Sequence, residues 1–271
     1  MRFAVLGSGS GGNATVVEAG GRCLLIDAGL SAKQLTLRLA QLGLSKENLT
    51  GILITHEHGD HVRGLDVFLR NHKIPVLAST MTCRVVQENL RAPAQWVAFE
   101  AGQRFEWEGF ELATFGLPHD AVDPVGYVIG RDGLKVGVAT DLGHVNDEVR
   151  RVLDGVEGLV LEANYEWHLL EADVKRPFST KQRISSHHGH LSNEQAGELV
   201  AALAGSGLRR VILGHLSSDC NCPDMAVEVV RRKIGEASVE ISVACQHEVT
   251  DWQSLESEVD PAFYGELFGR R

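Results

Sequence analysis

Residues 51–64 read GILITHEHGDHVRG, an apolar run that predicts a buried strand and leads directly into His56, His58, Asp60 and His61. His56 and His58 are two positions apart, so their side chains point the same way if the backbone stays extended. Gly59 then permits a sharp turn, which would direct Asp60 and His61 to a second point nearby. Because neutral imidazoles and carboxylates are ligands of borderline divalent metals, the segment predicts a metal site.

Three later apolar runs also end in a polar residue of this kind. LATFGLP precedes His119, LKVGVAT precedes Asp141, and RRVILG precedes His215. Polar groups at the ends of buried strands lie where ligand pockets form, so we predict two divalent metal ions per chain, Zn²⁺ or Mn²⁺. The alternative for each later residue alone is a hydrogen-bonded core histidine or a turn aspartate. The predicted ligands are His56, His58 and His119 for one ion, Asp60, His61 and His215 for the other, and Asp141 as a bridge.

The order of elements favours one α/β domain over residues 1–250, with a polar tail over residues 251–271. Short apolar strands alternate with amphipathic helices, but residues 95–140 read as consecutive strands with little helix. Because residues 95–140 read as consecutive strands, two sheets packed face to face with helices outside fit better than a doubly wound parallel sheet. Residues 165–191 read as irregular.

The composition of the chain indicates where in the cell the protein is located, but it says less about its binding partners. The 271 residues contain no apolar run as long as a membrane span and no signal-peptide pattern, and the five cysteines do not form a disulfide framework. We therefore expect a cytoplasmic protein without a membrane partner. The net charge of −10 argues weakly against a nucleic-acid coat protein, but a local positive patch is enough to bind an anionic substrate.

The motifs together resemble those of the metallo-β-lactamase superfamily. They are DAG at Asp27, THEHGDH at residues 55–61, His119, Asp141 and His215. The resemblance implies a four-layer αββα sandwich with a dinuclear metal site at one edge of the sheets. Asp27, at the end of a strand, would hold one ligand histidine in a single tautomer.

Other segments resemble the YycJ/WalJ branch of this superfamily, which is similar to bacterial double-strand DNA 5′-to-3′ exonucleases linked to mismatch repair. These segments are GSGSGGNAT, PHDAVDPVGY, LEANY and SHHGHLSNEQA. The resemblance implies DNA as substrate and DNA-repair proteins as possible partners. Cys220 and Cys222 depart from the branch, which more often has asparagines there. The interval between Asp141 and His215 is too short for the domain that ribonuclease J inserts at this point.

Glu162 in LEANY and His190 in GHLSN match the glutamate–histidine pair of ribonuclease Z. The match implies that His190 contacts the scissile phosphate or protonates the leaving oxygen, while Glu162 orients it. His187 and His188 are rivals, but only His190 has the HLSN context. We predict in-line attack by a metal-bound hydroxide on phosphorus, with Asp60, Glu162 and His190 as catalytic residues.

Two segments are candidates for substrate binding. Ser10 and Asn13 lie in a glycine-rich loop whose amides could face a phosphate, although a plain tight turn fits equally well. Trp167 and Phe178 flank a basic stretch and could stack on an exposed base or close a small local core. The stretch could track a phosphate backbone or form a solvated loop, and its basic residues are Lys175, Arg176, Lys181 and Arg183.

The leading hypothesis is a dinuclear-metal phosphodiesterase that acts as a 5′-to-3′ exonuclease on double-stranded DNA. One alternative keeps the metals but cleaves a small cyclic phosphate diester. A second is a nucleic-acid-binding module without catalysis. RNA as substrate, the opposite strand polarity and any oligomeric state stay open at this point.

Overall fold

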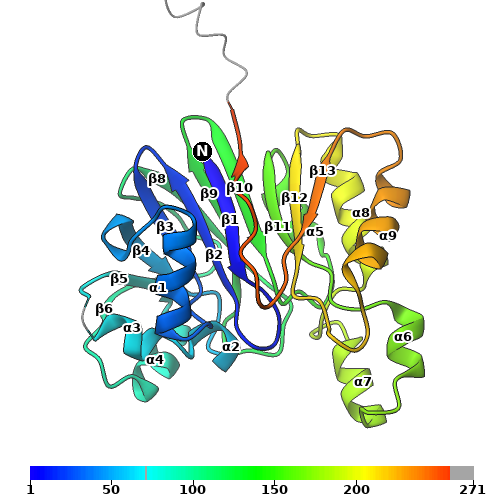
Figure 1. The fold of residues 1–271 in the computed structure, drawn as a ribbon, viewed down its shortest axis with the longest axis horizontal. Helices are drawn as coiled ribbons and strands as arrows, with labels where there is room; N and C mark the ends of the chain where they lie inside the picture. The colour runs from blue at the N-terminus through cyan, green and yellow to red at the C-terminus, as the bar shows by residue number, and fades with distance from the viewer. Residues whose placement is uncertain (71, 257–271) are drawn as a thin grey trace, which may run out of the picture.

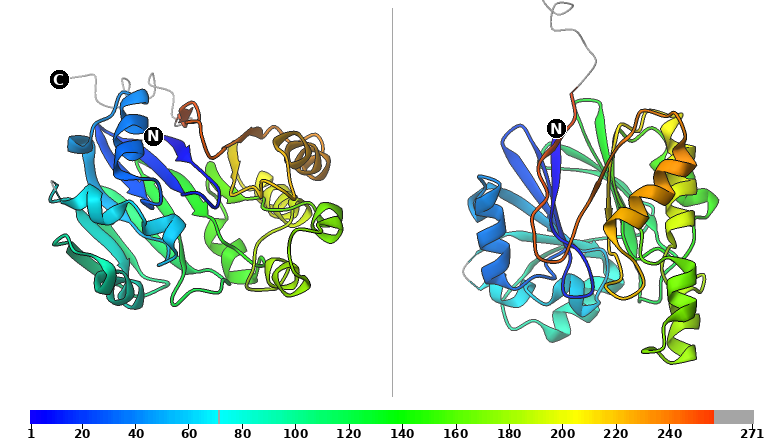
Figure 2. Two further views of the ribbon diagram at one scale, coloured as in Figure 1. Left: turned by 60° about the horizontal axis from the view of Figure 1, so that its bottom comes forward. Right: turned by 45° about the vertical axis from the view of Figure 1, so that its right-hand side comes forward.

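Two mixed β-sheets pack face to face, and helices cover both outer faces, in the computed structural model, which describes residues 1–70 and 72–256 (Figures 1 and 2). Helices α1 (Ala32–Gln41), α3 (Leu65–Leu69) and α4 (Thr80–Asn89) lie outside the first sheet. Helices α5 (Asp147–Leu153), α8 (Asn193–Ala204) and α9 (Pro223–Ile234) lie outside the second. The predicted αββα sandwich is therefore confirmed.

The first sheet runs in the order β14-β1-β2-β3-β4-β5-β6, and the second in the order β13-β12-β11-β10-β9-β8-β7. The strands of the first sheet are β1 (Arg2–Gly7), β2 (Ala14–Ala19), β3 (Arg22–Ile26), β4 (Leu49–Leu53), β5 (Pro75–Ser79), β6 (Gln95–Phe99) and β14 (Gln253–Ser254). Those of the second are β7 (Arg104–Trp107), β8 (Phe110–Gly116), β9 (Val125–Arg131), β10 (Leu134–Ala139), β11 (Gly158–Glu162), β12 (Arg210–Gly214) and β13 (Glu240–Val243).

Three apolar layers hold the sandwich together. The layer between the sheets contains the fully buried Phe3, Phe110 and Tyr127, and each sheet packs a second apolar face against its helices. Strands buried on both faces read as continuous apolar runs, which is why "CLLI" and "VILG" lack polar alternation. The Tyr127 hydroxyl donates to the Ile54 carbonyl at 2.6 Å, so the core also restrains the backbone just before the histidine motif.

Parallel pairing brings the site residues to one edge. Strands β3, β4, β5 and β6 are parallel neighbours in the first sheet, as are β10, β11, β12 and β13 in the second. Parallel strands end at the same edge, so the residues that follow β3, β4, β10, β11 and β12 meet there. Helix α2 (Gly59–Val62), formed by the histidine motif, marks this edge at the bottom of Figure 1.

One predicted irregular region is wrong. Residues 165–191 contain two short helices, α6 (Trp167–Ala172) and α7 (Phe178–Ile184), which extend from the lower edge in Figure 1. Each is too short to show helical periodicity clearly, and Pro177 precedes α7 directly. A small cluster of Tyr165, Leu170 and Cys220 packs beneath them.

The chain end has two parts. Gln253 and Ser254 form β14, which pairs with Phe3 and Arg2 at the edge of the first sheet. The rest of the predicted tail, residues 257–271, lies outside the described residues. Within the described ranges, no helix has the length and apolar character needed to cross a membrane.

Gly29 lets three segments of the site edge approach one another. A Cβ added at Gly29 would lie 1.6 Å from the Asp60 carbonyl oxygen and 2.7 Å from the Asn13 amide nitrogen. The Asn13 amide donates to that carbonyl at 2.7 Å, and the Gly29 amide donates to the Asn13 carbonyl at 2.9 Å. The main chains themselves are in contact here, so no side-chain movement can relieve the clash.

We expect Gly29→Ala to lower the free energy of unfolding by about 1–3 kcal/mol or more, because the new methyl group overlaps backbone atoms. Urea denaturation would measure the change. Gly205→Ala is the matched control, since its φ is −76° and no heavy atom lies within 4 Å of the added Cβ. Equal midpoints for Gly29→Ala and the unsubstituted protein would contradict the close approach described here.

Candidate metal centre and active site

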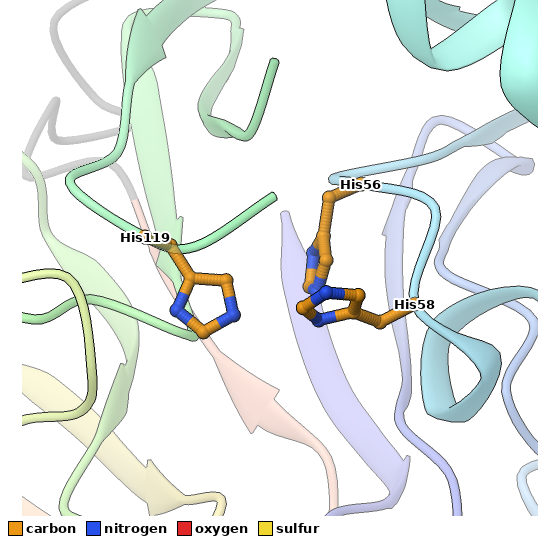
Figure 3. A group of neighbouring side chains, drawn as sticks. All are labelled: His56, His58 and His119. Carbon is orange, nitrogen blue, oxygen red and sulfur yellow. The ribbon is translucent and has the colours of Figure 1, made fainter. Parts of the chain in front are cut away.

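His56, His58 and His119 face one another across the junction of the two sheets. Figure 3 shows His56 and His58 projecting from the loop after β4, and His119 from the loop between β8 and β9 on the opposite side. The ring centroids lie 4.6 Å apart for His56 and His58, and 5.2 Å apart for each of these with His119. One nitrogen from each ring lies within 4.8 Å of the others, so this predicted group of three could hold a metal ion.

Asp60, His61 and His215 form a second group beside the first, with ligand atoms again within 4.8 Å of one another. Asp141 lies between the groups. Its Oδ2 is 3.0 Å from His61 Nε2 and 3.2 Å from His215 Nδ1, while its Oδ1 is 3.8 Å from His119 Nε2. The structure thus brings all seven predicted ligands together at one place. Other combinations also lie within 4.8 Å of one another, His56, His61 and Asp141 as well as Asp141, Glu162, His190 and His215, so the division between two ions stays a prediction.

Unpartnered atoms test whether these residues suit a metal. Within the described part of the chain, the buried atoms His56 Nε2, His119 Nε2, Asp141 Oδ2 and His215 Nδ1 have no partner in hydrogen-bond geometry, although Asp141 Oδ2 lies 3.2 Å from His215 Nδ1. Leaving one buried polar atom unpaired costs about 1–3 kcal/mol, so four in one place would be costly without a bound group. The donor set of imidazoles and carboxylates suits Zn²⁺ or Mn²⁺, and the residues therefore fit divalent ions.

Hydrogen bonds on the far side of three rings orient their free nitrogens. His56 Nδ1–H donates to Thr55 Oγ1 at 2.9 Å, His61 Nδ1–H donates to Asp27 Oδ2 at 2.7 Å, and His119 Nδ1–H donates to the Gly189 carbonyl at 3.0 Å. Each bond engages Nδ1 and turns Nε2 inward, so Nε2 is the nitrogen available to a metal. Asp27 lies where its predicted role needs it. The sequence did not predict that Thr55 and Gly189 orient ligand histidines, because neither residue type signals such a role.

Burial and neighbouring charges shift the pKa values of the cluster in both directions. Burial, with the nearby charge of His61, lowers the pKa of His56 well below its usual value. Burial also lowers the pKa of His119, outweighing the opposing effect of Asp141. Burial raises the pKa of Asp141, but His215 and His61 together outweigh it and hold that pKa well below its usual range. Burial lowers the pKa values of His61 and His215, but Asp141 outweighs it and raises both, and Asp27 adds to the effect on His61. Because metals bind neutral imidazoles and ionised carboxylates, a bound cation would displace the protons of these two rings.

Backbone strain is concentrated at the strand ends of this site. Asp27, Asp141 and His215 have φ values of 63°, 59° and 54°, in the left-handed region that non-glycine residues rarely adopt. Each follows the end of a strand, where the chain turns at the site edge. Such strain is typical of functional positions.

Glu162 and His190 form a pair next to Asp141. The fully buried Glu162 accepts a hydrogen bond from His190 Nδ1–H at 2.8 Å, and from the amides of Leu191 at 2.6 Å and Asp141 at 3.1 Å. Burial lowers the pKa of His190, but Glu162 and Asp141 outweigh it and raise that pKa to about 9. The His190 ring lies 5.4 Å from that of His119 and 5.2 Å from that of His215. A protonated imidazole is therefore held beside both ligand groups.

The rival histidines lie further out. His187 and His188 are exposed. Their backbone carbonyls accept hydrogen bonds, that of His187 from His144 Nδ1–H at 2.9 Å and that of His188 from the Asp120 amide at 3.1 Å. The geometry therefore favours His190 over both.

The glycine-rich loop is built differently from the prediction. Asn13 is only 4% exposed, and its side chain accepts from the Gly9 amide at 2.9 Å and donates to Asp60 Oδ2 at 3.2 Å. The Gly11 amide donates to Gln246 Oε1 at 2.7 Å. The amides of Gly9, Gly11 and Asn13 all donate within the protein, so the structure favours the tight turn over a loop whose amides face a phosphate. Asn13 instead braces a predicted ligand, whereas Ser10 is exposed on the loop surface.

All four basic residues predicted to bind substrate make internal polar contacts, and for three of them these contacts lie away from the ligand cluster. Lys175 pairs with Asp219 at 2.5 Å, Arg176 pairs with Asp173 at 2.7 Å, and Lys181 donates to the Glu171 and Asp173 carbonyls at 2.8 and 3.0 Å. These contacts connect α6, α7 and the segment between them. The sequence could not show this, because Asp219 lies far along the chain.

Arg183 differs from the other three because it borders the ligand cluster. Its Nε lies 2.5 Å from Asp120 Oδ2, and Asp120 Oδ1 is 3.4 Å from His119 Nε2. The side chain of Arg183 is 66% exposed, so much of its guanidinium remains open to solvent at the rim. Trp167 and Phe178 are 56% and 70% exposed, which disfavours the alternative of a closed local core for both.

The chain matches the family model of the beta-lactamase superfamily domain over residues 22–216. It is 32% identical over 247 residues to exodeoxyribonuclease WalJ of Streptococcus pneumoniae serotype 2, covering 90% of this chain and 91% of that protein. It is 33% identical over 254 residues to exodeoxyribonuclease YycJ of Bacillus anthracis, covering 93% and 96%. The metallo-β-lactamase fold protein YhfI from Bacillus subtilis aligns with a TM-score of 0.71 at 17% identity, covering 92% of this chain and 98% of that one.

The chain therefore belongs to the metallo-β-lactamase superfamily, a class of metal-dependent hydrolases. Within that class it is similar to the WalJ and YycJ exodeoxyribonucleases over about nine tenths of its length, which confirms the resemblance found in its motifs.

We expect Asp27→Asn to weaken divalent-metal binding about 10–100-fold, because an amide cannot hold His61 in the same tautomer as a carboxylate. Titration of Zn²⁺ against a competing chelator would measure the affinity. Asp132→Asn removes the same charge from a side chain that is 88% exposed, in the turn between β9 and β10, and should leave the affinity unchanged. Equal affinities for both variants would show that Asp27 does not act on the metal site.

Proposed function

We propose that this protein is a metal-dependent nuclease, specifically a dinuclear-metal phosphodiesterase that removes nucleotides from double-stranded DNA in the 5′-to-3′ direction. The observation that carries the proposal is the placement of the Glu162–His190 pair beside Asp141, whose carboxylate oxygens lie 3.0–3.8 Å from histidines of both candidate ligand groups. The similarity to two proteins named exodeoxyribonucleases supports DNA as the substrate class. Zn²⁺ or Mn²⁺ as cofactor, a cytoplasmic location and DNA-repair partners belong to the same proposal.

The ligand residues can be assigned to two ions. His56, His58 and His119 would hold one, Asp60, His61 and His215 the other, and Asp141 would contact both. Bound divalent ions supply Lewis-acid polarisation of a phosphate and lower the pKa of water. His61 and Asp60 come from the same short helix, so Asn13 and Asp27 together fix the orientation of this second group.

His190 has the features of the group that acts on the leaving oxygen. Its Nδ1–H is bound by Glu162, so its Nε2 is the nitrogen left to meet a substrate. The raised pKa keeps the ring protonated at neutral pH, so Nε2–H can donate to a developing oxyanion or transfer its proton. Glu162 stabilises the imidazolium and also accepts a hydrogen bond from the Asp141 amide. One carboxylate therefore positions both His190 and Asp141.

A labelled-duplex assay tests this function directly. Duplex DNA carrying a 5′ label should release labelled mononucleotides in the presence of Mn²⁺ or Zn²⁺, and none after chelation. Release from the 3′ end would overturn the polarity. Cleavage of cyclic phosphate diesters alone would favour the small-molecule alternative, and duplex binding without cleavage would favour the binding module.

We expect His190→Ala to lower kcat on duplex DNA by about 10²–10⁴-fold, the usual contribution of a general acid. Metal content, measured by elemental analysis, should not change, because the seven ligand residues remain. His188→Ala is the matched control and should retain activity, since only its backbone contacts the site. Loss of metal from His190→Ala would instead assign His190 to the ligand set.

We expect Arg183→Gln to raise KM for duplex DNA and to reduce the salt dependence of binding by about one unit of slope, because one phosphate contact is lost. Lys175→Gln should leave the slope unchanged, since Lys175 pairs with Asp219 and does not border the ligands. Binding measured by fluorescence anisotropy across a salt series would distinguish them. The same slope for both variants and the unsubstituted protein would remove Arg183 from the substrate path.

A further inference from the structure

A cavity of about 480 Å³ lies beside the second ligand group, and no residue of the proposed mechanism accounts for it. Three loops line it, residues 8–11 after β1, residues 216–223 after β12, and residues 244–247 after β13. Leu216 follows His215 directly, and the hydroxyl of Ser8, in the cavity wall, accepts a hydrogen bond from the His215 amide at 2.8 Å. The cavity is therefore continuous with the segment that bears a predicted metal ligand.

The chemistry of the lining is uncharged. The residues that line the cavity, all within the described ranges, include no Asp, Glu, Lys or Arg. Leu216, Pro223 and Ala244 provide apolar surface, while Ser10, Ser218 and His247 are exposed and provide polar groups. A phosphate site is normally built from cationic side chains, so this lining does not suit one. A flat, neutral group with hydrogen-bonding edges does suit it.

The backbone amides of the loop after β1 already donate hydrogen bonds within the protein, which further disfavours an anion as the ligand. The Ser8 amide donates to the Cys245 carbonyl at 3.1 Å, the Gly12 amide to the Gly9 carbonyl at 3.0 Å, and the Gly11 amide to Gln246 Oε1 at 2.7 Å. Gln246 Nε2 in turn donates to the Gly12 carbonyl at 2.8 Å. The loop therefore lacks the row of outward amides that would grip an anion.

We propose that this cavity binds a nucleobase of the nucleotide that adjoins the scissile phosphate. The inference rests on the proposed nuclease function, and it locates the uncharged part of the substrate next to the part that is cleaved. His247 and Pro223 offer flat surfaces for stacking, and Ser10 and Ser218 offer hydroxyls to base edges. Recognition of this kind tolerates different bases, as an end-directed nuclease requires.

Cys222 provides a direct reporter, because it lines the cavity and is exposed, while Cys23, Cys83 and Cys220 are buried. The rate of alkylation of Cys222 by iodoacetamide can be followed by peptide mass spectrometry on the protein as purified. A bound deoxynucleoside should slow it by a factor of 1 + [nucleoside]/Kd, about tenfold near ten times Kd. Deoxyadenosine and thymidine are the probes, and 2-deoxyribose 5-phosphate is the base-free control.

Each outcome bears on the inference. Protection by the nucleosides but not by the sugar phosphate supports it. Protection by the sugar phosphate would show an anion site at the start of α9, and no protection by any probe would show that no nucleotide part enters, so either result overturns it. If labelled duplex is cleaved but Cys222 is not protected, the base site fails and the nuclease function stands. If Cys222 is protected but duplex stays intact, the nuclease function fails.

A filling variant gives an independent readout. Ser218→Trp should obstruct the cavity, abolish protection by the nucleosides and raise KM for duplex DNA severalfold, with metal content unchanged. Gln41→Trp, on the exposed end of α1, is the matched control for adding an indole to the surface. Unchanged KM and unchanged protection in Ser218→Trp would contradict the inference even if the variant folds normally.

Discussion

The buried carboxylate of Asp141 is the constraint on which the site edge depends. An ionised group only 3% exposed cannot be left without compensation, because removing its charge from water costs several kcal/mol. Compensation comes from imidazoles on both sheets, His61 on the first and His215 on the second, at 3.0 and 3.2 Å. The two sheets must therefore pack so that these three side chains meet at the site edge. Divalent ions would complete the balance of charge.

The loops around this carboxylate hold the predicted ligands in position. Asn13 connects the loop after β1 to Asp60, Glu162 connects Asp141 to His190, and the Gly189 carbonyl connects His119 to the same His190 segment. The position of the proposed acid is thus coupled to that of a predicted ligand. Orientation of a site to within fractions of an ångström requires such support from surrounding residues.

The charge distribution explains how an acidic protein can act on an anionic polymer. The chain carries a net charge of −10, and the basic residues of α6, α7 and the segment between them are largely neutralised by acidic neighbours such as Asp219 and Asp120. In the proposed function, bound ions and a protonated His190 supply positive charge where the phosphate reacts. Arg183 adds charge at the rim, and the uncharged cavity beside His215 is left for the remainder of a nucleotide.

The amino-acid sequence alone predicted two packed sheets with outer helices and seven candidate ligands, because apolar runs and the residues that end them are local patterns. The four-layer sandwich and the Glu162–His190 pair came from the resemblance of motifs to known families. Only the tertiary structure decided that Asn13 is buried against Asp60, that Lys175 pairs with Asp219, and that residues 165–191 contain two helices. The first two facts depend on contacts between segments distant in the chain, of which local periodicity carries no record. The two helices were missed because each is too short to show helical periodicity.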